Sequence, residues 1–126
     1  MADKPDWDPI RALAHRILRS GEELALTEDV RRLLARTASE VAISEASATS
    51  ALESEAGARA LLEECSRRIR EGSNRLTDAL HLMYRHQDAG DFDNARQQMR
   101  DVLAVEVVPY YRDLAQGQLD DMADDP

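Results

Sequence analysis

Apolar residues recur at three- and four-residue intervals along most of the chain, which is the spacing of one face of an α-helix. The first stripe begins after Asp8-Pro9, where aspartate suits a helix cap and proline suits the first turn. Gly21 should end this helix. A second stripe follows Thr27, another capping residue. The two stripes consist of Ile10, Leu13, Ala14, Ile17 and Leu18, and of Val30, Leu33, Leu34, Thr37 and Val41.

The pattern is weakest over residues 44–57, which are rich in Ser, Ala and Glu. Ser44 can cap a short helix that would hold Ala48, Ala51 and Leu52. The same composition also suits a loop. The sequence leaves both structures open for this stretch.

The longest periodic segment spans residues 58–87 and carries two heptad lines. One consists of Leu62, Ile69, Leu76 and Met83, and the other of Cys65, Gly72, Ala79 and His86. This is the seam of two helices that pack like a coiled coil. Gly72-Ser73 could end one helix and cap another, but the heptad phase survives across the pair, which favours one continuous helix.

A turn at residues 88–91 should lead into a last helix over residues 91–116, which Asp91 caps. Pro109 should kink this helix, because proline removes one backbone hydrogen bond and crowds the preceding turn. Its expected apolar face consists of Phe92, Ala95, Met99, Val102, Leu103, Glu106, Tyr110, Tyr111 and Leu114. The prediction is an all-α, small helical bundle, in which two shorter N-terminal helices pack on a long antiparallel helical hairpin.

Length and composition fit one domain over residues 1–126, with a frayed N-terminus at residues 1–6 and an acidic C-terminal tail at residues 117–126. Aromatic residues make up only 4% of the chain, so aliphatic side chains must build the core. A single cysteine permits no internal disulfide, and no apolar run reaches the roughly 20 residues of a membrane span. We therefore expect a cytoplasmic protein.

The formal net charge is −9, and residues 89–126 alone carry −6. Such acidity repels nucleic acids and anionic lipid surfaces at long range, so neither is an expected partner. A basic protein partner fits the charge better.

Several segments resemble a known family. They are residues 96–112, with the sequence RQQMRDVLAVEVVPYYR, together with Trp7-Asp8 followed by Ile10, Leu26-Thr27, and residues 85–90. In these segments the chain resembles the DUSAM family, a paralogous set from myxobacteria. The resemblance implies a bacterial, cytoplasmic protein present in several versions per genome. It implies no activity and no catalytic residues.

Metal and catalytic candidates are weak. Asp78 and His81 are three residues apart, as in half of a carboxylate-bridged di-metal motif, and Glu106 is the carboxylate nearest the facing seam. The second half of the motif is absent from the sequence, and a surface position explains His81 as well. Cys65 lies on the apolar seam, where a thiol behaves as a small hydrophobe. Neither a glycine-rich phosphate loop nor a nucleophile elbow is present, so we expect no enzyme and no cofactor.

The strongest interaction candidates are Tyr110, Tyr111 and Arg112. Two successive tyrosines on a helix cannot both face one core line, so one should be at least partly exposed. Exposed tyrosine beside arginine is typical of binding hot spots. The hypothesis is a non-catalytic protein–protein interaction module, an adaptor, regulator or inhibitor of a basic partner, either monomeric or homodimeric. The alternative is a small helical metal- or ligand-binding protein, possibly enzymatic.

Overall fold

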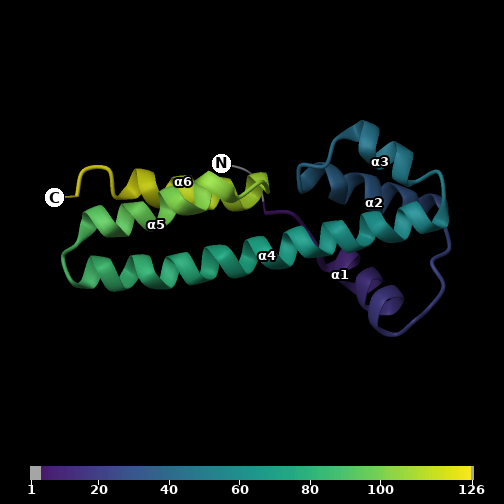
Figure 1. The fold of residues 1–126 in the computed structure, drawn as a ribbon, viewed down its shortest axis with the longest axis horizontal. Coiled ribbons are helices and arrows are strands. Elements are labelled where there is room, and N and C mark those ends of the chain that lie inside the picture. Colours follow the sequence, from purple (N-terminus) through teal and green to yellow (C-terminus); the bar gives the residue numbers. More distant parts are fainter. Residues whose placement is uncertain (1–3, 126) are drawn as a thin grey trace. The chain divides into compact units, whose positions relative to one another are not determined.

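The computed structural model describes residues 4–125, and within them it contains six α-helices, one π-helical segment and no strand. Figure 1 shows the helices in chain order. The predicted all-α bundle is confirmed. The chain divides into two compact units, Lys4–Ile69 and the part from Arg70 onward, which are described separately below. The single domain expected for residues 1–126 stays a prediction.

The first unit begins with α1 (Asp8–Ala14), which continues into the π-helical segment η1 (His15–Arg19). Asp8 is the first helical residue and not the cap, because Trp7 occupies the N-cap position. The Trp7 indole is buried, and its Nε1 donates to Glu40 Oε1 at 3.2 Å. Gly21 follows with a φ of +74°, the left-handed geometry that glycine adopts without strain. The apolar stripe predicted for this helix supplies the buried side chains Ile10, Leu13 and Ile17.

Two capped helices complete the N-terminal part of this unit. α2 (Glu28–Glu40) begins after Thr27, whose side chain accepts from the Val30 amide at 3.2 Å. α3 (Glu45–Ala51) begins after Ser44, which accepts from the Ser47 amide at 3.1 Å. Residues 44–57, for which the sequence left helix and loop open, thus form a short helix, a turn at residues 52–54 and the start of the next helix.

α4 (Glu55–Asp88) is one continuous helix of 34 residues that enters both units. It passes through Gly72-Ser73 without a break, as the heptad phase predicts. The side chains of the first heptad line, Leu62, Ile69, Leu76 and Met83, are all buried.

In the second unit, α5 (Phe92–Val105) and α6 (Pro109–Asp121) lie side by side and run in opposite directions (Figure 1). Asp91 caps α5 as predicted, by accepting from the Asn94 amide at 3.2 Å. The prediction of one kinked helix over residues 91–116 is wrong. Pro109 begins a new helix, where its missing N–H costs no hydrogen bond, and Val108 just before it is extended.

The C-terminal tail predicted for residues 117–126 is ordered in its described part. α6 continues to Asp121, and the Met122 side chain is buried. Arg96 Nη1 donates to the carbonyl oxygens of Met122 at 2.7 Å and Asp125 at 3.1 Å, which ties the last residues to α5. Residues 1–3 of the expected N-terminal tail, and residue 126, lie outside the described range.

None of the helices formed by residues 4–125 combines the length and the apolar character needed to cross a membrane.

Candidate interaction site

The junction between α5 and α6 presents alternate side chains to opposite sides. Its backbone is extended at Glu106 and at Val108, and in extended chain successive side chains point in opposite directions. Glu106 is only 3% exposed and Val108 is fully buried, whereas Val105 is 60% and Val107 50% exposed. The junction therefore places a carboxylate inside and two valines outside.

The buried Glu106 carboxylate is fully engaged. Its Oε1 accepts from Arg75 Nη1 of α4 at 2.8 Å, and its Oε2 accepts from the backbone amides of Val107 and Val108, each at 3.0 Å. These amides precede α6, so the carboxylate also lies at the positive end of that helix. A charge removed from water requires such partners to be tolerated.

Arg112, which lies on α6, caps the C-terminal end of α5. Its Nη1 donates to the carbonyl oxygens of Leu103 at 2.7 Å and Glu106 at 2.8 Å. These carbonyls belong to the last turn of α5 and the residue after it, where a helix leaves acceptors without intrahelical donors. Glu106 and Arg112 thus cap each other's helix and hold the junction in one geometry.

The two tyrosines have different environments. Tyr111 is 5% exposed and lies against Gly72 of α4, where an added Cβ would stand 2.6 Å from the Tyr111 Cε2 atom and 2.9 Å from Glu106 Oε1. Tyr110 is half-buried, and its ring centroid lies 5.7 Å from that of Tyr111. The sequence-predicted trio therefore comes together at one junction, but Tyr111 packs inside while Arg112 caps α5.

Sequence reasoning did not identify Gly72, Arg75, Val105 and Val107 as parts of this junction. The available signal was the Val-Pro pair at 108–109, because the residue before a proline prefers extended backbone. An extended stretch next to a helix end would have predicted the alternation of Glu106 and the two exposed valines.

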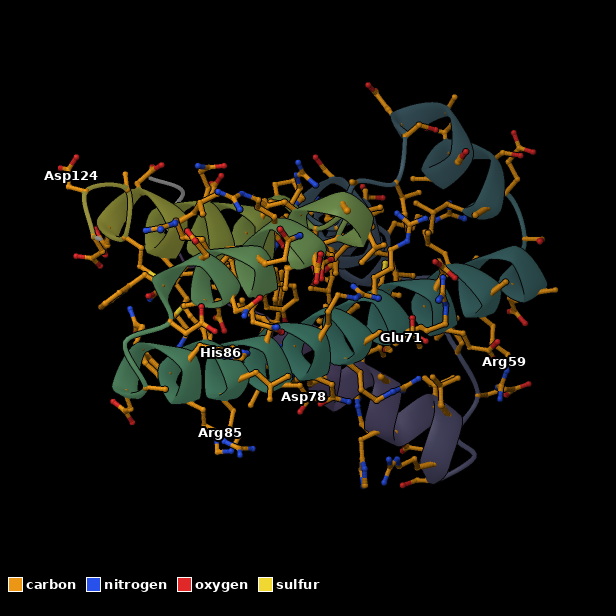
Figure 2. The ribbon with its side chains drawn as sticks, turned by 60° about the vertical axis from the view of Figure 1, so that its left-hand side comes forward. Arg59, Glu71, Asp78, Arg85, His86 and Asp124 are labelled. Atoms are coloured by element: carbon orange, nitrogen blue, oxygen red, sulfur yellow. The ribbon has the colours of Figure 1, made fainter. Side chains whose placement is uncertain are left out.

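The metal candidates are not brought together. Asp78 and His81 are exposed on α4, and Figure 2 shows Asp78 on the side of α4 opposite α5 and α6. Glu106 is buried, and its oxygens are occupied by Arg75 and the two amides. Within residues 4–125, no group of three or more His, Cys, Asp or Glu side chains is placed to hold a metal ion.

Cys65 is fully buried, and that burial raises the pKa of its thiol to about 12. The nearby Arg68 opposes the rise by favouring the thiolate, but desolvation outweighs it. The thiol therefore lacks the anionic character of a nucleophile.

The first unit also contains surface cavities. One, of about 420 Å³, lies between α2 and α3 and is lined by Ala35, Arg36, Ser39, Ile43, Glu45, Ala48, Thr49 and Leu52. Another, of about 290 Å³, adjoins η1 and the connector to α2. The polar side chains that line these two cavities lie mostly at exposed positions. Neither cavity therefore has the buried polar groups of a built ligand site.

Comparison with known proteins identifies a family. A family model described as "Protein of unknown function (DUF2379)" matches residues 5–122, nearly the whole chain. Neither the curated proteins nor the solved structures contain a match to the chain.

Proposed function

The chain belongs to DUF2379, a family of proteins of unknown function, and from this premise we propose that it is a non-catalytic module that binds another protein. We further propose that DUSAM, which the chain resembles between Trp7 and Leu114, is this same family. Several versions of such a module in one bacterial genome would suit partner-specific binding in the cytoplasm. No step of the proposal requires a cofactor.

The observation that carries the proposal is the clustering of exposed apolar side chains around the α5–α6 junction. In the described chain five large hydrophobic residues are exposed, and three of them, Val105, Val107 and Leu114, lie within ten residues of one another. Tyr110 adds a half-buried ring one helical turn before Leu114. We call Val105, Val107, Tyr110 and Leu114 the junction surface.

Rigidity supports a binding role for the junction surface. The mutual caps of Glu106 and Arg112 fix the backbone that carries the two valines, and Arg75 ties the same backbone to α4. A surface that is ordered before binding loses less conformational entropy when a partner docks. The backbone amides of Val107 and Val108 are already bonded, so recognition would use side chains and not an added strand.

Charge favours a basic partner. Residues 89–126 carry nine carboxylates against three arginines, and two exposed carboxylates, Asp101 and Asp113, lie within five residues of the junction. Such a field steers a cationic protein toward the apolar surface, while the apolar contact limits dissociation. The attraction is screened beyond about 8 Å at physiological ionic strength.

The test compares exposed positions only, so that binding is separated from folding. Immobilised wild-type protein, a Val105→Ser/Val107→Ser variant and a Tyr84→Ser control are incubated with lysate of the native host. A retained protein is then purified and its affinity is measured for each variant. Tyr84 is 50% exposed on α4, outside the junction, and serves as the control for loss of an exposed apolar side chain.

We expect the Val105→Ser/Val107→Ser variant to lose at least tenfold in affinity and the control to bind like the wild type. Higher salt should slow association. If the purified partner binds the double variant and the wild type equally, the junction surface is not the recognition site. Tyr111→Ala and deletion of residues 118–126 are unsuitable probes, because both remove buried side chains.

A further inference from the structure

The outward face of α4 in the second unit carries a short ordered stripe of charge and apolar surface. Asp78, Leu82 and Arg85 follow one another at intervals of four and three residues, which places them on one helix face. All three are exposed, and Figure 2 shows Asp78 and Arg85 on the side of α4 opposite α5 and α6. We call these three residues the α4 stripe.

Neither charged side chain of the α4 stripe has a partner within the described chain. Most other exposed arginines of α4 are engaged, as Arg59 is with Glu63 at 3.5 Å and Arg67 is with Glu64 at 3.0 Å. The side chains of Asp78 and Arg85 form no hydrogen bond or ion pair among residues 4–125. They are too far apart, about 10 Å along the axis, to pair with each other.

We propose that the α4 stripe is a self-association surface that takes a second copy of this chain, packed antiparallel along α4. With a two-fold axis passing between His81 and Leu82, residue 78 of each copy faces residue 85 of the other. Two identical Asp78–Arg85 pairs then flank a central contact in which each Leu82 meets His81 and Leu82 of the partner.

The choice of a second copy follows from the order of the charges. A stripe that reads acidic, apolar, basic is complementary to itself when reversed, as an isologous contact requires. A nucleic acid or lipid surface would instead favour charges of one sign. The contact is small, below the roughly 1,200 Å² of standard interfaces, so we expect a weak dimer with a dissociation constant of about 0.1–1 mM.

Salt alone does not test the contact, because it screens both the ion pairs and the mutual repulsion of two chains of charge −9. Charge reversal does test it. Sedimentation equilibrium of the full chain, up to about 1 mM protein, is measured for the wild type, Asp78→Arg, Arg85→Asp, the double variant, and a mixture of the two single variants. Circular dichroism verifies that each variant is folded, which exposed positions should permit.

Each single variant places two like-charged pairs in the dimer and should weaken association about tenfold. Asp78→Arg is the more informative of the two variants, because it reduces the net negative charge of the chain. It would therefore strengthen any association that is limited only by repulsion between two acidic chains. The double variant restores both pairs and should recover dimerisation. The mixture should form a heterodimer, since the two stripe arginines of the Asp78→Arg chain then meet the two stripe aspartates of the Arg85→Asp chain.

Two controls complete the design. Arg100→Asp changes the net charge as Arg85→Asp does but lies on α5, where Arg100 is exposed, and should leave association close to the wild type. Leu82→Ser should weaken the dimer without altering its charge. The proposal is overturned if the wild type stays monomeric over the whole concentration range, if the single reversals associate like the wild type, or if neither the double variant nor the mixture recovers.

Discussion

Substitution of Gly72 by alanine brings two physical effects into opposition. Gly72 lies inside α4, with no positive φ, so alanine should favour the helix by about 0.8–1.0 kcal/mol through its higher propensity. The added Cβ, however, would stand 2.6 Å from Cε2 and still closer to Cδ2 of the Tyr111 ring, and 2.9 Å from Glu106 Oε1. Carbon atoms pack at roughly 3.5–4.0 Å, so something must move.

Neither neighbour can move freely. The Tyr111 ring is buried, and the Glu106 carboxylate is held by Arg75 and by two backbone amides. Insertion of an extra carbon into a well-packed core costs about 1–3 kcal/mol. Because the contacts are this close and both neighbours are held, the cost should lie in the upper part of that range, at about 2–3 kcal/mol. It then outweighs the gain in propensity, and we expect Gly72→Ala to destabilise the protein by about 1–2 kcal/mol net.

Gly117→Ala is the matched control. Gly117 also lies in a helix, α6, without a positive φ, and an added Cβ would meet no atom within 4 Å. This substitution should stabilise by about 0.5–1 kcal/mol. The two alanines should thus shift the urea midpoint, followed by far-ultraviolet circular dichroism, in opposite directions.

A double-mutant cycle assigns the clash to the ring. In a Tyr111→Leu background most of the close approach is removed, so Gly72→Ala should become close to neutral, with a coupling of about 1–2 kcal/mol. If Gly72→Ala raises the midpoint as much as Gly117→Ala does, Tyr111 does not pack against α4 at this position and the described junction is wrong.

Three further substitutions and one reactivity test probe other parts of the structure. Ala42→Gly should stabilise by about 0.5–1 kcal/mol in urea denaturation, because Ala42 has a φ of 65° at the α2–α3 turn; an unchanged or lower midpoint would contradict that backbone geometry. Cys65 should react with a thiol reagent far more slowly in the native state than in urea, since burial raises its pKa to about 12; equal rates would place it at the surface. Glu64 has a pKa lowered by its hydrogen bond from Arg67, so its stabilising effect is complete at neutral pH and is lost as the pH falls from the ordinary carboxylate pKa through the lowered pKa of the folded state; Glu64→Gln should therefore flatten the acid side of the stability profile. Glu106→Ala should cost about 3–5 kcal/mol, measured by thermal or urea unfolding, because it leaves a guanidinium partly buried without its carboxylate; a loss below about 1 kcal/mol would exclude a structural role for the pair.

Helix starts were predictable from the sequence because a capping bond is local. Thr27, Ser44 and Asp91 each accept a hydrogen bond from the backbone amide three residues ahead. The capping residue alone therefore predicts the interaction, because its partner is always a backbone group nearby in the sequence. The continuity of α4 was predictable for a related reason. The heptad pattern keeps its phase across Gly72, which indicates that one helix face packs along the whole segment. A single glycine of low helix propensity does not interrupt a helix that is held by such packing.

The break at Glu106 was not predictable in the same way. A proline late in an apolar pattern is compatible with a kinked helix or with the start of a new one. The contacts that decide between them come from α4, since Arg75 lies 31 residues before the carboxylate that it binds. Sequence spacing around Pro109 contains no information about that pair.

The break also resets the phase of the last helix, and this reset creates the junction surface. An unbroken apolar face through Met99, Val102 and Glu106 was expected to continue into Tyr110, Tyr111 and Leu114. After the non-helical residues 106–108, α6 instead buries Tyr111 and Ala115, and Met122 just after the helix is buried on the same side, at intervals of four and seven. Tyr110 is half-buried and Leu114 is 36% exposed. Leu114, which the helical pattern assigns to the core, therefore lies on the outer side of α6, and Tyr110 is the partly exposed tyrosine that the sequence predicts. Sequence reasoning located the segment that meets a partner in our proposal, but the side chains that are available to do so depend on how a buried carboxylate orients the next helix.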